Sequence, residues 1–321
     1  LYLKDGRHLA IIPKEVLGRL LFWYAEAVRI PATAVTPQGN ALGSMVIRIQ
    51  HRNKRLLVRN LTPTFSRRSG ATSPKSNLSR QRSKLQPIAR SVAQSGLGPV
   101  VMILDILAGG PKQGFLVDIS KAFAGDIPGL SAKPVILASG VRPGGLVPAA
   151  TYIARARVFP QNLSIRTHLT FSGSKVALTG IPAATTASVV VGHSITLLPE
   201  KPMKARNFDE RIGYFTTQFA EFEPGKDSVV ENRAVVLRHR LQKKNPTAAV
   251  SDPIKPIVFY IGREVPNRWR PYIKAGVEDW RQAFEAAGFS NAISAKDAPT
   301  LAEDPSWSPE DSRHSVIRWL A

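Results

Sequence analysis

The residues best suited to binding a metal ion or transferring protons near neutral pH are six histidines, and the chain contains no cysteine. The histidines are His8, His51, His168, His193, His239 and His314. A helix that carries zinc ligands places two histidines four positions apart, so that both rings share one face. No two histidines here have that spacing, and none directly precedes a glutamate. We therefore name no catalytic, cofactor-binding or metal-binding residue, and we interpret His239 and His314 as structural.

Other short patterns that could carry chemistry also fail. Residues 109–112, Gly-Gly-Pro-Lys, lack the frame of a phosphate-binding Walker loop. No Gly-x-Ser-x-Gly nucleophile elbow occurs. Asp209 and Glu210 are adjacent carboxylates, whose side chains diverge on most backbones. An ion pair or turn with Arg211 is therefore favoured over an acid–base pair.

The charge balance is strongly basic, with 44 Lys and Arg against 23 Asp and Glu and a formal net charge of +21. Such a balance favours an anionic partner. The excess is concentrated in two groups. The first, on an expected hairpin, is Arg48, Arg52, Lys54, Arg55 and Arg59, and the second is Arg67, Arg68, Lys75, Arg80, Arg82 and Lys84.

The second group lies in a Ser/Thr/Pro-rich stretch at about 62–84, which we interpret as a flexible, solvated loop. Phe65 is the only aromatic residue there, whereas binding of single-stranded nucleic acid needs stacking platforms as well as charge. Non-specific polyanion binding through residues 48–84 remains an alternative. It would make the chain a basic protein that binds nucleic acid or an anionic surface.

Alternating apolar residues and turn signals predict antiparallel strands through most of the chain. Residues 1–4 and 9–12 form one expected hairpin around Asp5–Gly6, and residues 45–51 and 55–59 form another. Residues 15–29 fit either a helix or a buried strand. Residues 85–94 are expected to form a short helix. Further strands are expected at 100–104, 115–119, 152–158, 163–171, 188–198 and 234–241.

A new α/β domain is expected to begin near residue 254, after proline-rich punctuation at 245–256. Residues 257–261 are a compact apolar strand. Residues 267–287 have the periodicity of an amphipathic helix that ends at Gly288. Its Trp269, Trp280 and Phe284 are expected to pack against that strand.

This C-terminal third resembles the bacterial zinc-dependent metalloproteases of the met-zincin type. Residues 238–246 are similar to the segment just before the family's catalytic domain. Residues 255–261, Lys-Pro-Ile-Val-Phe-Tyr-Ile, resemble that domain's first strand. Residues 275–289 resemble its first long helix, and residues 313–319 resemble the strand after it.

Upstream, residues 207–215 contain a Phe-Asp-x-Arg-x-Gly-Tyr-Phe segment similar to one that recurs in the same family. Residues 3–7 and the hairpin at 45–59 fit its β-rich N-terminal region more loosely. The resemblance is specific from residue 207 onward and absent at 62–84.

The resemblance implies a secreted or periplasmic peptidase that cleaves peptide or protein substrates with a zinc-activated water. In that family a His-Glu-x-x-His helix and a third histidine hold the zinc, and this helix lies C-terminal to the residues present here. Zinc is therefore expected in the full-length parent and none in this chain. We expect this chain to be inactive alone. A relative that kept the scaffold and lost the active site is a further alternative.

The expected fold is α+β: a β-rich N-terminal region of antiparallel strands, followed by the truncated beginning of a zincin-like α/β domain. The expected divisions are residues 1–244 for the β-rich region, 245–256 for a linker and 257–321 for the incomplete catalytic domain. No apolar run of about eighteen residues predicts a membrane span. No signal peptide is visible, and both ends fall inside expected strands, so we interpret the chain as a fragment.

Overall fold

The computed structural model describes residues 1–31, 34, 38–61, 65–67, 98–175, 184–222 and 230–319. The expected basic loop at 62–84, apart from the backbone of 65–67, and the expected helix at 85–94 lie outside the described residues. The chain divides into two compact units. The first contains Leu1–Val158 and Leu163–Leu237, and the second contains Phe159–Asn162 and Arg238–Ala321.

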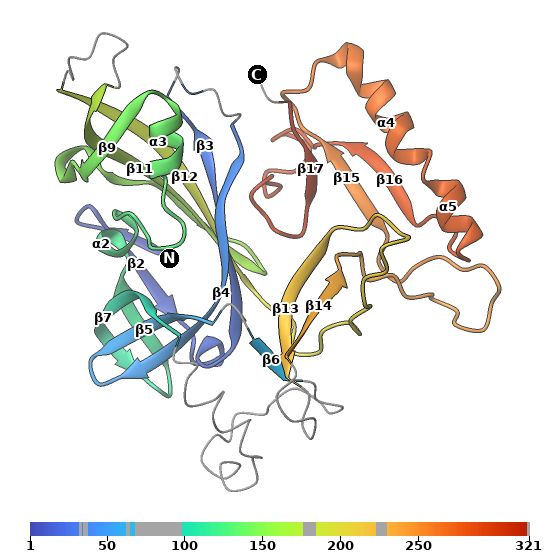
Figure 1. Ribbon diagram of the computed structural model, residues 1–321, viewed down its shortest axis with the longest axis horizontal. Helices are drawn as coiled ribbons and strands as arrows, with labels where there is room; N and C mark the ends of the chain where they lie inside the picture. Colours follow the sequence, from blue (N-terminus) through green and yellow to red (C-terminus); the bar gives the residue numbers. More distant parts are fainter. Residues whose placement is uncertain are drawn as a thin grey trace, which may run out of the picture. The chain divides into compact units, whose positions relative to one another are not determined.

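The first unit is built mainly from antiparallel strands (Figure 1), which confirms the predicted α+β, β-rich fold class. Its strands are β1 (Tyr2–Lys4), β2 (Arg7–Ile12), β3 (Leu20–Arg29), β4 (Asn40–Arg52), β5 (Arg55–Asn60), β6 (Phe65–Arg67), β7 (Val100–Gly110), β8 (Gly114–Asp118), β9 (Val141–Leu146), β10 (Tyr152–Val158), β11 (Asn162–Lys175), β12 (Ala184–Leu197), β13 (Thr216–Phe222) and β14 (Val230–Val236). Short helices interrupt them at η1 (Lys14–Val16), α2 (Ser120–Phe123), α3 (Lys133–Ala138) and η3 (Pro148–Ala150).

Within the described ranges, one long sheet runs in the order β1-β2-β8-β7-β5-β4-β3-β12-β11-β10, and β9 pairs with β11. Strands β14, β13 and β6 form a separate small sheet. Helices α2 and α3 add Phe123, Val135 and Ile136 to the buried core that covers the inner face of the long sheet. The core therefore joins buried residues from Ala10 to Val191.

Residues 20–29 form a strand, which decides between the two structures that the sequence allowed for 15–29. Leu21, Trp23, Ala25 and Ala27 are buried, whereas the residues between them are half-buried or exposed. This alternation places one face of β3 on the core, as expected for a strand with a period of two.

The predicted hairpins at the N-terminus and at 45–59 are confirmed, and the predicted strands at 152–158 and 163–171 pair as a third hairpin. Asp5 and Gly6 both have positive φ, of 50° and 72°, which is the backbone of a tight two-residue hairpin turn. The predicted strand at 234–241 is partly wrong, because β14 ends at Val236. Residues 237–242 have no regular structure, and this segment leads into the second unit.

The second unit contains a parallel sheet in the order β16-β15-β17, formed by β15 (Ile257–Ile261), β16 (Ile293–Asp297) and β17 (Ser315–Ile317). The connection from β15 to β16 passes through η4 (Asn267–Trp269), α4 (Arg270–Glu278) and α5 (Arg281–Ala286). Helix α4 packs on β16 and β15 (Figure 1). Arg270 and Lys274 of this helix both bind the carboxylate of Asp297 at the end of β16.

The predicted helix at 267–287 is confirmed in position, although it is divided at Asp279 and Trp280. Both residues keep right-handed helical dihedral angles, and the amide of Phe284 still donates to the carbonyl of Trp280. Gly288 has a φ of 84°, a left-handed conformation that ends the helix as expected.

The segment that we expected to be a linker, 245–256, is held against the second unit by its backbone. Lys243 forms a β-bridge with Pro253, and Ser251 forms one with Phe289 just after α5. The carboxylate of Asp252 accepts hydrogen bonds from Ser290 and Asn291, which lowers its pKa. The second unit therefore extends upstream of the first parallel strand.

A buried Trp–His pair lies where β3 meets β12. Trp23 is completely buried, and its indole N–H donates to Nδ1 of His193 at 3.3 Å. Nε2 of His193 is buried with no hydrogen-bond partner in the described part of the chain. The ring of Phe123 packs edge-on against the imidazole at 5.6 Å. Burial among these rings lowers the pKa of His193 to about 4, so the imidazole is neutral near pH 7.

We predict that acid destabilises the first unit through His193. Between its ordinary pKa of 6.5 and its folded pKa of about 4, the unfolded chain binds a proton that the folded chain does not. The free energy of unfolding therefore falls as the pH falls through this range, by about 3 kcal/mol. Urea unfolding followed by circular dichroism, at about pH 7 and about pH 4.5, measures the change.

The matched variants are His193→Gln and His168→Gln. Glutamine at 193 keeps an acceptor for Trp23 but does not titrate, so its stability should depend less on pH than that of the wild type. His168 stacks on Tyr152 outside this pair, and its variant should keep the wild-type pH dependence. The same pH dependence in wild type and His193→Gln would contradict the assignment.

Candidate functional site

The second unit contains an open groove of about 310 Å³ between its helices and its parallel sheet. The lining is almost wholly apolar. The sheet contributes Ile257, Phe259, Ile293 and Ile317, the helices contribute Gly276, Val277, Trp280 and Phe284, and the segment before the sheet contributes His239. A groove of this composition binds an apolar group and offers few polar atoms to orient it.

Among the described residues that line the groove, His239 is the one with a titratable side chain. It lies in the irregular segment after β14 rather than on a strand, which corrects our expectation of a strand at this position. Its ring packs edge-on against Phe259, with centroids 6.5 Å apart. The described lining residues beside it include no carboxylate, hydroxyl or amine, so they offer no acid–base pair.

The tryptophans of the helix are far more exposed than we expected. Trp280 is 63% exposed although it lines the groove, and neither α4 nor α5 contains a fully buried residue. The ring centroids of Trp269 and Tyr272 lie 6.2 Å apart, and the guanidinium of Arg268 lies over the Trp269 ring. The prediction that Trp269 and Trp280 are core residues is wrong, because they are 41% and 63% exposed in the part of the chain that the structure describes.

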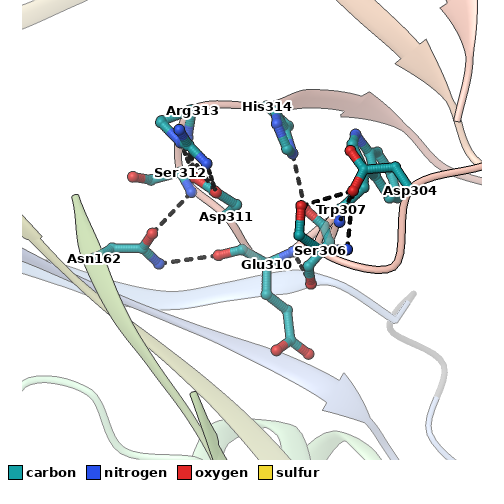
Figure 2. A network of polar contacts seen from close by, with 10 residues as sticks. Asn162, Asp304, Ser306, Trp307, Glu310, Asp311, Ser312, Arg313 and His314 are labelled. Atoms are coloured by element: carbon teal, nitrogen blue, oxygen red, sulfur yellow. Dashed lines mark hydrogen bonds and ion pairs between the residues drawn. The ribbon is translucent and has the colours of Figure 1, made fainter. Parts of the chain in front are cut away.

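The second unit also contains a network of polar contacts, in the loop between β16 and β17 (Figure 2). Asp311 lies at its centre with a side chain only 2% exposed, and its carboxylate accepts hydrogen bonds from Nε and Nη2 of Arg313. Burial alone would raise the pKa of Asp311, but the hydrogen bonds and the charge of Arg313 outweigh burial and lower it. The carboxylate is therefore ionised and paired.

Asn162 completes this loop from a distant part of the sequence (Figure 2). Its Nδ2 donates to the carbonyl of Glu310 at 2.9 Å, and its Oδ1 accepts from the amide of Ser312 at the same distance. The side chain is buried and fixes two backbone groups that would otherwise need other partners. Asp304 acts similarly at the other end of the loop, where it accepts from Ser306 and from the amide of Trp307.

His314 packs into an aromatic cluster at the end of the loop. Its ring stacks on Trp307 with centroids 5.3 Å apart, and Tyr260 of β15 meets both rings edge-on. Its Nδ1 lies 3.0 Å from the carbonyl of Ser308, and since a carbonyl only accepts, this nitrogen carries the proton. These contacts give His314 a structural role.

The histidines lie in separate places within the described structure. His8 is on β2, His51 is on β4 beside Phe115, and His168 is on β11. In the part of the chain that the structure describes, no three His, Asp or Glu side chains come together in a group able to hold a metal ion. These residues therefore do not fit a zinc centre.

The family-like segment at 207–215 is an exposed stretch beside β14. Arg211 binds both carboxylate oxygens of Asp209, at 2.8 and 2.6 Å, and this hydrogen bonding lowers the pKa of Asp209. The predicted local ion pair is confirmed. Phe215, the last residue of the segment, is among the most exposed apolar residues described.

Comparison with known protein families gives a match to a domain of unknown function, DUF5117, over residues 39–244. That region is more than half of the chain. The chain belongs to the DUF5117 family. No match is found among curated proteins or among solved structures. None of the helices in the described ranges of this DUF5117 chain combines the length and the hydrophobicity needed to cross a bilayer.

The DUF5117 match covers much of the first unit and ends at residue 244, close to where the second unit begins.

Sequence patterns did not identify the groove or the loop network. The loop depends on Asn162, which is far from residue 310 in the sequence, and a lone asparagine in a turn carries no local signal of such a partner. Asp311 and Arg313 are two residues apart in the sequence, and this spacing was the available signal for their ion pair.

We predict that Asp311→Asn opens the loop between β16 and β17. The substitution removes the charge that faces Arg313 and weakens hydrogen bonds in a buried setting, at a cost of about 2 kcal/mol. The amides of residues 304–314 should then exchange with deuterium roughly 30-fold faster, since local opening sets their exchange rate. Hydrogen–deuterium exchange of the full chain measures this.

The matched control is Asp209→Asn, which also removes a carboxylate that binds an arginine two residues away. The Asp209 pair is exposed, so its loss should change local exchange little. Unchanged exchange at 304–314 in Asp311→Asn would show that the buried pair does not hold the loop.

Proposed function

We propose that this chain is the N-terminal, non-catalytic part of a secreted or periplasmic zinc-dependent metallopeptidase. The observation that carries the proposal is the order of elements in the second unit. The segments that resemble the start of a met-zincin catalytic domain form, in turn, strand β15, helices α4 and α5, and strand β17 of one parallel sheet. Membership of an uncharacterised family is compatible with this proposal but does not test it.

The groove beside the helix gives this proposal further support. A parallel sheet normally has both faces covered, because its strands are apolar on both sides. Here Val277, Trp280 and Phe284 face Ile257 and Phe259 across an open hollow. Such a surface suits a scaffold onto which further structure packs, and its described lining residues do not include the polar groups of a complete catalytic centre.

The parent enzyme would cleave peptide bonds in a peptide or protein substrate with a zinc-activated water. The described residues of this chain do not supply the ligand set, because no group of three candidate ligands comes together among them. We therefore assign no step of the reaction to a residue of this chain. Its proposed role is to carry and shape the catalytic domain.

We predict that the purified chain does not cleave casein, with or without added zinc. The test of the wider proposal is the coding DNA beyond the codon for Ala321, where a His-Glu-x-x-His motif followed by a third histidine is expected. A protein that includes this motif should cleave casein, and replacing the motif's glutamate with glutamine should abolish cleavage. Zinc-dependent cleavage by the present chain alone would contradict the assignment.

An open reading frame that continues without the motif, or a nearby stop codon, would instead favour a relative that kept the scaffold and lost the active site. This outcome would contradict the proposal that the parent protein is a peptidase. It would leave the structural description of both units unchanged.

A second candidate function is polyanion binding by the first unit. The observation that favours it is the pairing of β4 with β5, which sets Arg48 opposite Arg59 and Arg52 opposite Arg55. Like charges directly opposite each other on neighbouring strands are destabilising unless an anion lies between them. This function is independent of peptidase chemistry.

We predict that the chain is retained on heparin and that its affinity falls steeply with salt. The slope of log affinity against log salt should become shallower by about two when Arg52 and Arg55 are both replaced by glutamine, since each arginine releases about one counterion. Isothermal titration at several salt concentrations measures the slope. An identical slope in the variant would place heparin binding elsewhere in the chain.

A further inference from the structure

The two arginine pairs lie on one face of the long sheet in the first unit. Directly opposite residues of an antiparallel pair share a face, with Cβ atoms about 5 Å apart. Arg48 and Arg59 therefore form one pair, and Arg52 and Arg55 form a second pair at the hairpin end. Met45, Ile47 and Ile49 of β4 point to the core, so the arginines point to the outer face.

Little negative charge opposes these arginines. The chain has no aspartate or glutamate between Glu26 and Asp105, and that interval contains β4, β5 and the segment that connects β5 to β7. Asp105 lies opposite Arg55 and binds it at 3.0 Å, but both side chains are exposed and the pair is weak. Glu26 lies towards the far end of β3, opposite Ala41.

Arg59, by contrast, uses neutral acceptors. Arg59 donates to the side-chain oxygen of Gln50 and to the carbonyl of Gly98, neither of which carries a charge. Nε of Arg48 is buried and has no hydrogen-bond partner among the described residues. Among the described residues, the outer face of β4 and β5 therefore has more arginines than carboxylates that pair with them.

Exposed apolar side chains flank the arginines on both sides. On β3, Leu20 lies opposite Arg48, and Phe22 follows on the same face. On β7, Val100 lies opposite Arg59. Ile103 lies opposite Leu57 between the two arginine pairs and is 50% exposed. The face thus has a cationic centre and apolar borders.

We propose that the outer face of β4 and β5 docks on an anionic phospholipid surface, an inference that rests on the second candidate function above. The two arginine pairs bind headgroup phosphates, for which guanidinium groups have the matching fork geometry. Leu20, Phe22, Val100 and Ile103 enter the interfacial region beside them. An arginine near an anionic membrane adds to the attraction, which decreases as salt screens it.

The composition of the face favours a lipid surface over nucleic acid. Binding of single-stranded nucleic acid uses aromatic side chains on which bases stack. Of the four exposed apolar residues beside the arginines, Phe22 alone is aromatic, and the other three are aliphatic. Aliphatic side chains gain from burial in an acyl interface without stacking.

The experiment is co-sedimentation of the full chain with two kinds of vesicle, one of phosphatidylcholine alone and one that also contains roughly 30% phosphatidylglycerol. We expect binding to the anionic vesicles and little to the neutral ones. Arg52→Gln with Arg55→Gln should weaken binding to anionic vesicles roughly 30-fold. Arg157→Gln with Lys255→Gln removes the same charge from exposed positions outside this face and should have a much smaller effect.

Ile103→Ser separates lipid binding from simple charge attraction. It should weaken vesicle binding and leave the affinity for heparin unchanged, because heparin offers no apolar interior. Circular dichroism of each variant checks that the sheet is intact.

Three results would overturn the proposal. Equal binding to neutral and anionic vesicles would remove the role of the arginines. Heparin or a single-stranded oligonucleotide bound through Arg52 and Arg55, without vesicle binding, would leave polyanion binding in place and refute the lipid surface. Binding to none of these probes would refute both the lipid surface and the second candidate function, while leaving the peptidase proposal untouched.

Discussion

The pairing of β3 with β12 is the contact on which the first unit depends. It joins the strands formed by residues 2–60 and 100–118 to those formed by residues 141–197, and without it the long sheet would separate into two. Trp23 and His193 lie at this junction, fully enclosed by the core. This enclosure favours the neutral imidazole over the imidazolium. The pairing of β3 with β12 is therefore most stable when His193 is unprotonated.

The same junction explains why the strongly basic outer face does not prevent folding. The inner face buries a set of apolar side chains that runs from Ala10 to Val191, and burial of this area is the dominant favourable term in folding. Each like-charge pair on β4 and β5 costs a fraction of that stabilisation, because Arg52 and Arg55 are exposed to solvent and Arg59 is hydrogen-bonded to Gln50 and Gly98. The arginines can thus persist on the sheet without a carboxylate for each of them.

The sequence was sufficient to predict most strands, because alternation and turn residues report directly on one buried face. Asp5–Gly6 and the residues around Asn53 predicted hairpins that the structure contains, and the long helix near the C-terminus was predicted to within a break at Asp279. Segment 15–29 could not be assigned from sequence, since its first apolar residues fit two periods. The exposure of Trp269 and Trp280 could not be predicted either, because amphipathic spacing shows which face is apolar and not whether another element covers it. The loop network around Asp311 depends on a side chain about 150 residues away, which no local pattern reports.

The distribution of tryptophans gives the two units different optical properties. Trp23 is the one tryptophan of the first unit, whereas Trp269, Trp280, Trp307 and Trp319 belong to the second. An indole enclosed by aliphatic and aromatic side chains emits at shorter wavelength than one in contact with water, and Trp23 is fully enclosed whereas Trp280 is largely exposed. The intrinsic fluorescence of the chain is therefore a sum of a blue component from one unit and a mainly red component from the other. Replacing Trp23 with phenylalanine would leave tryptophan emission from the second unit alone. The emission spectrum can therefore report on the unfolding of each unit separately.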